Sequence, residues 1–287
     1  MPFADRRTVL VTAALAAAIG LMYSGVLSSL VRQWATDDNY SHGFFVVPLA
    51  LYFAWERRAA LAAAPARPGL FGVVVILGSL VVWAAGLLGS ELFLTRVSLI
   101  GVIAGTVWFV WGRWHLRILI FPILFLLLMI PLPSIIFNQL AFPLQLVASQ
   151  AGETVIAAAG IPVLREGNML HLPSRTLEVA EACSGIRSLV SLLMLAIVLG
   201  YFAEPRTGAR VALAFAAIPI AIIANATRVA GTGLAAEWVS PQAAEGFFHT
   251  FSGWLMFVVA FGGLLVIQQA LTHIHERRRR PALAGAA

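Results

Sequence analysis

Long apolar runs separated by short polar segments constrain this chain more than any other feature. Each run carries at most one charged residue. The runs are Thr8–Val31, Tyr40–Trp55, Leu70–Leu88, Leu92–Trp111, Ile118–Leu132, Gly185–Phe202, Val211–Ala226 and Thr250–Leu271. Because a helix needs about 20 apolar residues to cross the hydrocarbon core of a bilayer, they predict an all-α polytopic membrane protein of about eight transmembrane helices. The first run is longer than a signal-peptide core of about 7–15 residues, so we expect a retained helix there.

Composition excludes a soluble protein. Hydrophobic residues make up 60% of the chain and charged residues only 11%, whereas soluble domains are about 25% charged. The net charge of +6 does not indicate nucleic-acid binding, because the arginines lie in short loops rather than in one patch. A single cysteine, Cys183, excludes an intramolecular disulfide and the usual metal-ligand spacings. We therefore expect the lipid bilayer as the main surroundings, and no metal, cofactor or nucleic acid.

Arginines divide unequally between alternate loops. One set of loops holds Arg6, Arg7, Arg57, Arg58, Arg67, Arg113, Arg117, Arg206, Arg210 and Arg277–Arg280, and the other set holds Arg32, Arg96, Arg165, Arg175, Arg187 and Arg228. The positive-inside rule makes the richer side cytoplasmic, and both termini fall on it. The alanine-rich composition, with arginine as the only basic residue besides histidine, favours a bacterium of high genomic GC content. We therefore expect a bacterial inner membrane. The ends of three predicted helices, at Cys183, Arg228 and His249, then fall together on the periplasmic face.

We expect one integral membrane domain over residues 1–287, with an extracytoplasmic loop over 133–182. The apolar stretch Ser134–Ala151 within it could lie along the interface or re-enter the membrane. Short strands are expected at Pro162–Glu166, Met169–Leu172 and Thr176–Ala180, separated by turn residues. They form a small β-hairpin cap that leads directly to Cys183.

Cys183 precedes a predicted helix, where free N–H groups and the helix dipole favour the thiolate form. Arg187, one turn further on, would add to this effect. Ser184 is a candidate helix cap, and Gly185 would let another backbone or a substrate come close. The alternative is that Cys183 is a small buried apolar residue.

Arg228 and His249 are the other candidates for chemistry on this face. Arg228 is either a snorkelling anchor or a fixed cation that stabilises a thiolate, an oxyanion or an acidic substrate group. Asn225, one turn earlier, could hold that guanidinium or donate to a carbonyl. His249 is either structural or the group that moves a proton to and from sulfur and a leaving amine.

His42 is a rival histidine on the same face, beside two aspartates. It could bind a cation, orient a substrate or cap the next helix. A nucleophile, a cation and an acid–base group on one face together fit thiol acyl transfer. Two other readings remain open: a membrane transporter, and a scaffold subunit of a surface polysaccharide export system.

Four blocks resemble the exosortase/archaeosortase family of membrane transpeptidase-like enzymes. They are Asp38-Asn-Tyr-Ser-His-Gly43, Glu181-Ala-Cys-Ser-Gly-Ile-Arg-Ser188, Asn225-Ala-Thr-Arg228 and His249-Thr-Phe-Ser-Gly-Trp254. The resemblance implies a catalytic set of Cys183, Arg228 and His249, with Glu181 in a supporting position.

The same resemblance implies the substrates. These are membrane-anchored proteins with a C-terminal sorting signal: a short motif (Pro-Glu-Pro in the bacterial type), a transmembrane helix and a basic tail. The acidic motif could pair with Arg228, Arg187 or Arg175. The chain lacks the extra C-terminal domain of some bacterial members, which leaves its subfamily open.

Overall fold

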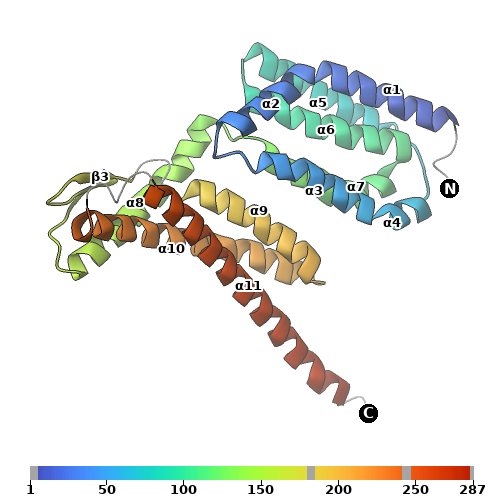
Figure 1. Ribbon diagram of the computed structural model, residues 1–287. Coiled ribbons are helices and arrows are strands. Elements are labelled where there is room, and N and C mark those ends of the chain that lie inside the picture. Colours follow the sequence, from blue (N-terminus) through green and yellow to red (C-terminus); the bar gives the residue numbers. More distant parts are fainter. Residues whose placement is uncertain (1–5, 180–184, 241–246, 285–287) are drawn as a thin grey trace. The chain divides into compact units, whose positions relative to one another are not determined.

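The computed structural model describes residues 6–179, 185–240 and 247–284. These residues are helical apart from one small sheet, and several of the helices are long and strongly apolar, so the expected all-α polytopic membrane architecture is confirmed (Figure 1). The chain divides into two compact units: unit 1 comprises Met1–Ser134 and unit 2 comprises Ile135–Ala287.

The number of membrane spans differs from the expected eight. Among the described residues, five helices are long and apolar enough to cross a bilayer, and two bent helix pairs raise the number to seven if each pair counts as one span. Helix α3, at Gly43–Glu56, has 14 residues. It is therefore about 21 Å long, shorter than a hydrocarbon core of about 30 Å. A count of eight stays a prediction.

The first unit is built from helices joined by short turns. They are α1 (Arg6–Met22), α2 (Ser24–Thr36), α3 (Gly43–Glu56), α4 (Arg58–Ala63), α5 (Phe71–Leu88), α6 (Leu92–Trp111), α7 (Arg113–Phe125) and the 3-10 helix η2 (Leu126–Met129). The expectation of one helix over Thr8–Val31 is wrong, because α1 and α2 meet at Tyr23 with a bend of 63°. Tyr23 is fully buried there and its hydroxyl shares a hydrogen bond with Ser98 Oγ at 2.9 Å.

The second unit contains four helices among its described residues. They are α8 (Ser134–Ala158), α9 (Ile186–Ala203), α10 (Thr207–Trp238) and α11 (Phe247–Ala284). The first half of the stretch expected as an extracytoplasmic loop is therefore the helix α8, which continues through Pro143.

Helix α10 is much longer than the run Val211–Ala226 from which it was expected. It has 32 residues and is about 48 Å long, so it extends beyond a hydrocarbon core of about 30 Å. The expectation that Arg228 ends this helix is wrong, because Arg228 lies ten residues before the last residue, Trp238. Arg228 follows Thr207 by 21 residues, or about 31 Å along the helix. If the hydrocarbon core of the bilayer begins near Thr207, its far boundary therefore lies near Arg228.

The small sheet has the strand order β1-β2-β3 and is antiparallel throughout. Its strands are β1 (Leu164–Glu166), β2 (Met169–His171) and β3 (Thr176–Glu178), and each lies within a range expected from the sequence. The sheet packs in one apolar cluster with α8 and the far end of α10; the buried members are Ala148, Ile156, Leu170, Leu172, Val179, Val229 and Ala236. Glu237 of α10 also accepts hydrogen bonds from the backbone N–H and the hydroxyl of Ser174, in the β2–β3 turn.

Helices α9, α10 and α11 share a second core. Its buried members are Leu192, Ala196, Leu213, Ala217, Ala221, Ala260 and Leu264. A buried carboxylate ties the turn between α9 and α10 to α11: Glu204 Oε1 accepts from Thr272 Oγ1 at 2.9 Å and from Gln268 Nε2 at 3.3 Å. The three helices are therefore fixed both by apolar packing and by polar contacts.

Candidate functional site

Helix α9 begins directly after a glycine with a left-handed backbone. Gly185 has φ +74°, a conformation that glycine adopts without steric cost. A Cβ at this position would lie 2.9 Å from Asn225 Cγ and 3.0 Å from Asn225 Cβ. The absence of a side chain at Gly185 therefore lets the Asn225 side chain of α10 lie against the start of α9.

Asn225 and Arg228 lie three residues apart on α10, so they share a helix face. Asn225 is buried, with an exposed fraction of 6%, and Arg228 is half-buried. A Cβ added at Gly253 of α11 would lie 3.3 Å from the guanidinium carbon of Arg228. One face of α10 therefore touches α9 through Asn225 and α11 through Arg228.

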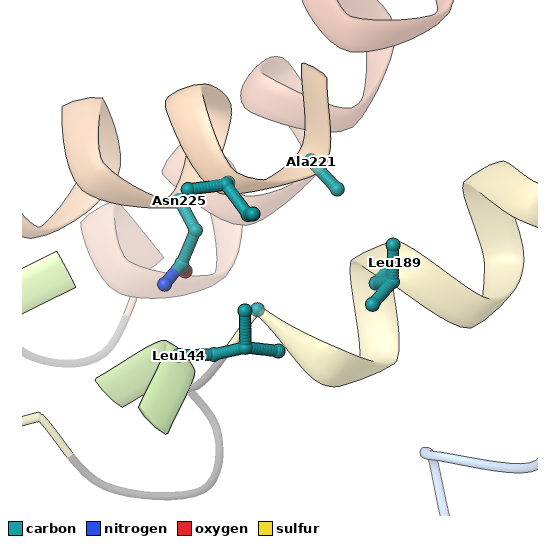
Figure 2. A pocket seen from close by; sticks show the side chains of 6 residues that line it. Leu144, Leu189, Ala221 and Asn225 are labelled. Carbon is teal, nitrogen blue, oxygen red and sulfur yellow. The ribbon is translucent and has the colours of Figure 1, made fainter. Parts of the chain in front are cut away.

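Two hollows border this face of α10. The first is lined by Leu144 of α8, Gly185, Leu189, Ala221, Ile222 and Asn225. Figure 2 shows the side chains of Leu144, Leu189, Ala221 and Asn225 around it. Asn225 is the polar side chain in an otherwise apolar lining.

The second hollow lies among α9, α10 and α11. Its polar lining residues are Ser188, Asn225 and Arg228, and its other walls include Gly253, Met256 and Phe257. Concave, mostly apolar sites with a few convergent polar groups are where proteins bind and orient ligands. A donor amide, a guanidinium and a hydroxyl in such surroundings could stabilise an oxyanion or a carboxylate.

Comparison with known families identifies the chain. A family model described as “Transmembrane exosortase” matches residues 34–266, which is most of the chain and includes all four sequence blocks. The chain belongs to the exosortase family. No curated protein and no solved structure matches it.

Three of the candidate exosortase residues, Glu181, Cys183 and Ser184, lie outside the described residues. Residue 249 lies in the first turns of α11, and its side chain is outside the described part. Within unit 2 the structure brings together Gly185, Asn225 and Arg228.

The remaining two arginine candidates lie elsewhere in unit 2. Arg187 is in the first turn of α9, half-buried. Arg175 directly precedes β3, and its backbone carbonyl accepts from Leu172 N at 2.9 Å.

His42 belongs to the first unit, where its contacts indicate a structural role. Its Nε2 lies 3.1 Å from the Leu128 carbonyl, and the Trp34 indole donates to the next carbonyl, Met129, at 3.0 Å. These are carbonyls of η2, which Pro131 prevents from continuing, so the two side chains satisfy backbone acceptors that a broken span would leave unbonded. Of the three roles left open for His42, the helix cap is not formed, since α3 has no side-chain cap bond.

Sequence reasoning did not single out Ser188, Leu144 or Gly253 as lining residues. Ser188 follows Gly185 by three residues and Gly253 follows His249 by four, so helical spacing could have placed each beside a chosen residue. Leu144 carries no such signal, because it comes from α8, in a stretch that was not assigned to a span.

Proposed function

We propose that this exosortase is a membrane-embedded cysteine protease or transpeptidase. It cleaves the C-terminal sorting signal of exported, membrane-anchored proteins by thiol acyl transfer, on the periplasmic side of a bacterial inner membrane. Cys183 is the nucleophile, Arg228 the oxyanion-stabilising cation and His249 the proton-transfer group.

One observation carries this proposal: the Asn225–Arg228 face of α10 meets both Gly185 and Gly253. Cys183 is two residues before Gly185, so their Cα atoms are at most about 7.6 Å apart. Residue 249 is four positions before Gly253 on α11, about 6 Å along the helix axis. These short distances support a common site for the three sequence blocks.

The reaction requires two steps at sulfur. The Cys183 thiolate attacks the carbonyl carbon of the scissile peptide bond, and Arg228 stabilises the negative charge on oxygen. The C–N bond then breaks as His249 gives its proton to the departing amine, leaving the substrate as a thioester on Cys183. Water or an acceptor amine attacks the thioester, gives a proton to His249 and releases the thiolate.

A substrate helix fits this arrangement. Its basic cytoplasmic tail fixes its orientation, so the motif before the helix lies at the periplasmic boundary. The length of α10 supports the same depth for Arg228, about one hydrocarbon thickness from Thr207. An acidic group of the motif would pair with Arg228, Arg187 or Arg175.

Substitution of Cys183 tests the proposal in cells that produce a protein with a matching C-terminal signal. Cys183→Ala and Cys183→Ser are expected to leave this substrate at full length on immunoblots. Because Cys183 is the only cysteine, the double variant Cys183→Ser/Ser184→Cys is a matched control that keeps one thiol but moves it by one residue, and it should also be inactive. Normal shortening of the substrate by Cys183→Ala would refute the proposal.

A further inference from the structure

Strand β3 has one paired edge and one outward edge. Leu172 N donates to Arg175 O and Val179 N donates to Asn168 O, both at 2.9 Å. With the register Leu170↔Leu177, odd-numbered residues of this strand direct their backbone groups toward β2. The N–H and C=O groups of Thr176 and Glu178 therefore point away from the sheet.

Among the described residues, nothing pairs with these outward groups. Across the described ranges of the chain, no hydrogen bond reaches the backbone N–H or C=O of Thr176 or Glu178. Both residues are exposed. Unpaired groups repeated every second residue form a template for another extended chain.

Apolar packing and hydrogen bonds fix the position of this strand edge within unit 2. Leu170 is fully buried and Val179 has an exposed fraction of 2%, both in the cluster shared with α8 and α10. The two hydrogen bonds from Ser174 to Glu237 fix the turn directly before β3. The orientation of the edge is therefore set before any ligand arrives.

The edge also lies close to the proposed nucleophile. Cys183 follows Glu178 by five positions, so their Cα atoms are at most about 18 Å apart. An extended peptide of about five residues covers that distance. A peptide bond inside a helix has its own N–H and C=O bonded, so a scissile bond has to be presented in an extended segment, the kind of chain that can pair with an edge strand.

We propose that the free edge of β3 binds the extended segment of the substrate next to its scissile bond as a fourth strand of the sheet. This inference rests on the proposed function. The Thr176 and Glu178 backbone groups supply affinity and set the register in which the scissile carbonyl reaches Cys183, whatever the side chains of the segment are.

Proline substitutions test the edge with matched controls. Among backbone hydrogen-bonding groups, Thr176→Pro and Glu178→Pro remove only outward N–H groups, and proline is tolerated on the unpaired side of an edge strand. Thr176→Val and Glu178→Gln keep those groups, and Thr176→Val also removes the 2.9 Å contact of the Thr176 hydroxyl with His171 Nδ1. In cleavage of a purified substrate by the full chain in detergent, each proline variant should raise KM about 2- to 12-fold, as the loss of one hydrogen bond predicts. The value of kcat should stay within about twofold of that of the unsubstituted chain, and the KM of each proline variant should exceed the KM of its side-chain control.

A substrate series makes the test independent of protein folding. Substrates N-methylated at successive backbone positions before the scissile bond should show alternately raised and unchanged KM with the unsubstituted chain. Cleavage with a KM that is indifferent to backbone methylation, or proline variants that match their controls, would overturn the β3 inference and leave the proposed function standing. No cleavage of any substrate by the unsubstituted chain would instead refute the proposed function.

Discussion

Replacement of Gly185 by alanine should destabilise the start of α9 in two ways, through backbone strain and through a steric clash. A non-glycine residue at φ +74° costs about 1–2 kcal/mol. The new Cβ would also lie 2.9 Å from Asn225 Cγ and 3.0 Å from Asn225 Cβ. Because Asn225 Cβ is fixed to the α10 backbone, rotating the amide does not relieve the clash, and overpacking adds about 1–3 kcal/mol. We expect Gly185→Ala to lower the unfolding free energy by about 2–5 kcal/mol.

Gly160 provides the matched control. It has φ +81°, and a Cβ there would meet nothing within 4 Å, so Gly160→Ala should lose only the backbone part of about 1–2 kcal/mol. Adding Asn225→Ala to Gly185→Ala should recover part of the steric cost in a double-mutant cycle.

The assay is reversible unfolding in mixed detergent micelles together with substrate cleavage. Gly185→Ala should reduce cleavage far more than Gly160→Ala, because it displaces the segment that carries Cys183. Equal stability and equal cleavage for the two alanine variants would refute the reasoning that Asn225 packs against this glycine.

Three further predictions concern single contacts. Gly253→Ala should lower kcat several-fold, because the new Cβ displaces the Arg228 guanidinium. Gly262→Ala on the same helix should leave kcat unchanged, because nothing lies within 4 Å of its Cβ; equal kcat values for the two variants would contradict the contact. Arg228→Lys should reduce kcat by about 10²–10³-fold, as loss of an oxyanion donor does. Arg206→Lys in the exposed α9–α10 turn should leave kcat unchanged. A fully active Arg228→Lys enzyme would show that Arg228 does not stabilise the oxyanion. His42→Leu, which loses the contact with Leu128 O, should lower the unfolding free energy by about 1–3 kcal/mol, as an unsatisfied buried acceptor does. His42→Gln, which can still donate to Leu128 O, should lose less; equal losses for the two variants would contradict the contact.

Periodicity and turn chemistry were sufficient for the elements whose stability is local. The bounds of α6, Leu92–Trp111, were predicted to the residue, because Glu91 and Gly112 stop an otherwise apolar run. The three strands lie within their predicted ranges, since Gly167–Asn168 and Pro173–Ser174 supply the two tight turns. Hydropathy alone could not show the bend at Tyr23, where the buried hydroxyl shares a hydrogen bond with Ser98 from a distant part of the sequence.

Long-range contacts account for most of what the sequence did not reveal about the site. Helix α10 was predicted to end near Ala226, but its polar continuation to Trp238 is stabilised by the sheet that packs on it. The approach of Asn225 to Gly185, and of Gly253 to Arg228, depends on helix packing that a single sequence does not encode visibly. His42 could not be assigned either, because its partner Leu128 is 86 residues away.

Acyl transfer on Cys183, beside the Arg228 face of α10, is the step on which the proposed function depends. It can be observed by mass spectrometry of the purified chain, quenched in acid during turnover of a substrate. We expect a Cys183-containing peptide that carries the N-terminal portion of the substrate as a thioester. Hydroxylamine should release this portion, and the thioester should accumulate when acceptor amines are withheld. Substrate that turns over at the normal rate while Cys183 remains unmodified at every time point would contradict this mechanism.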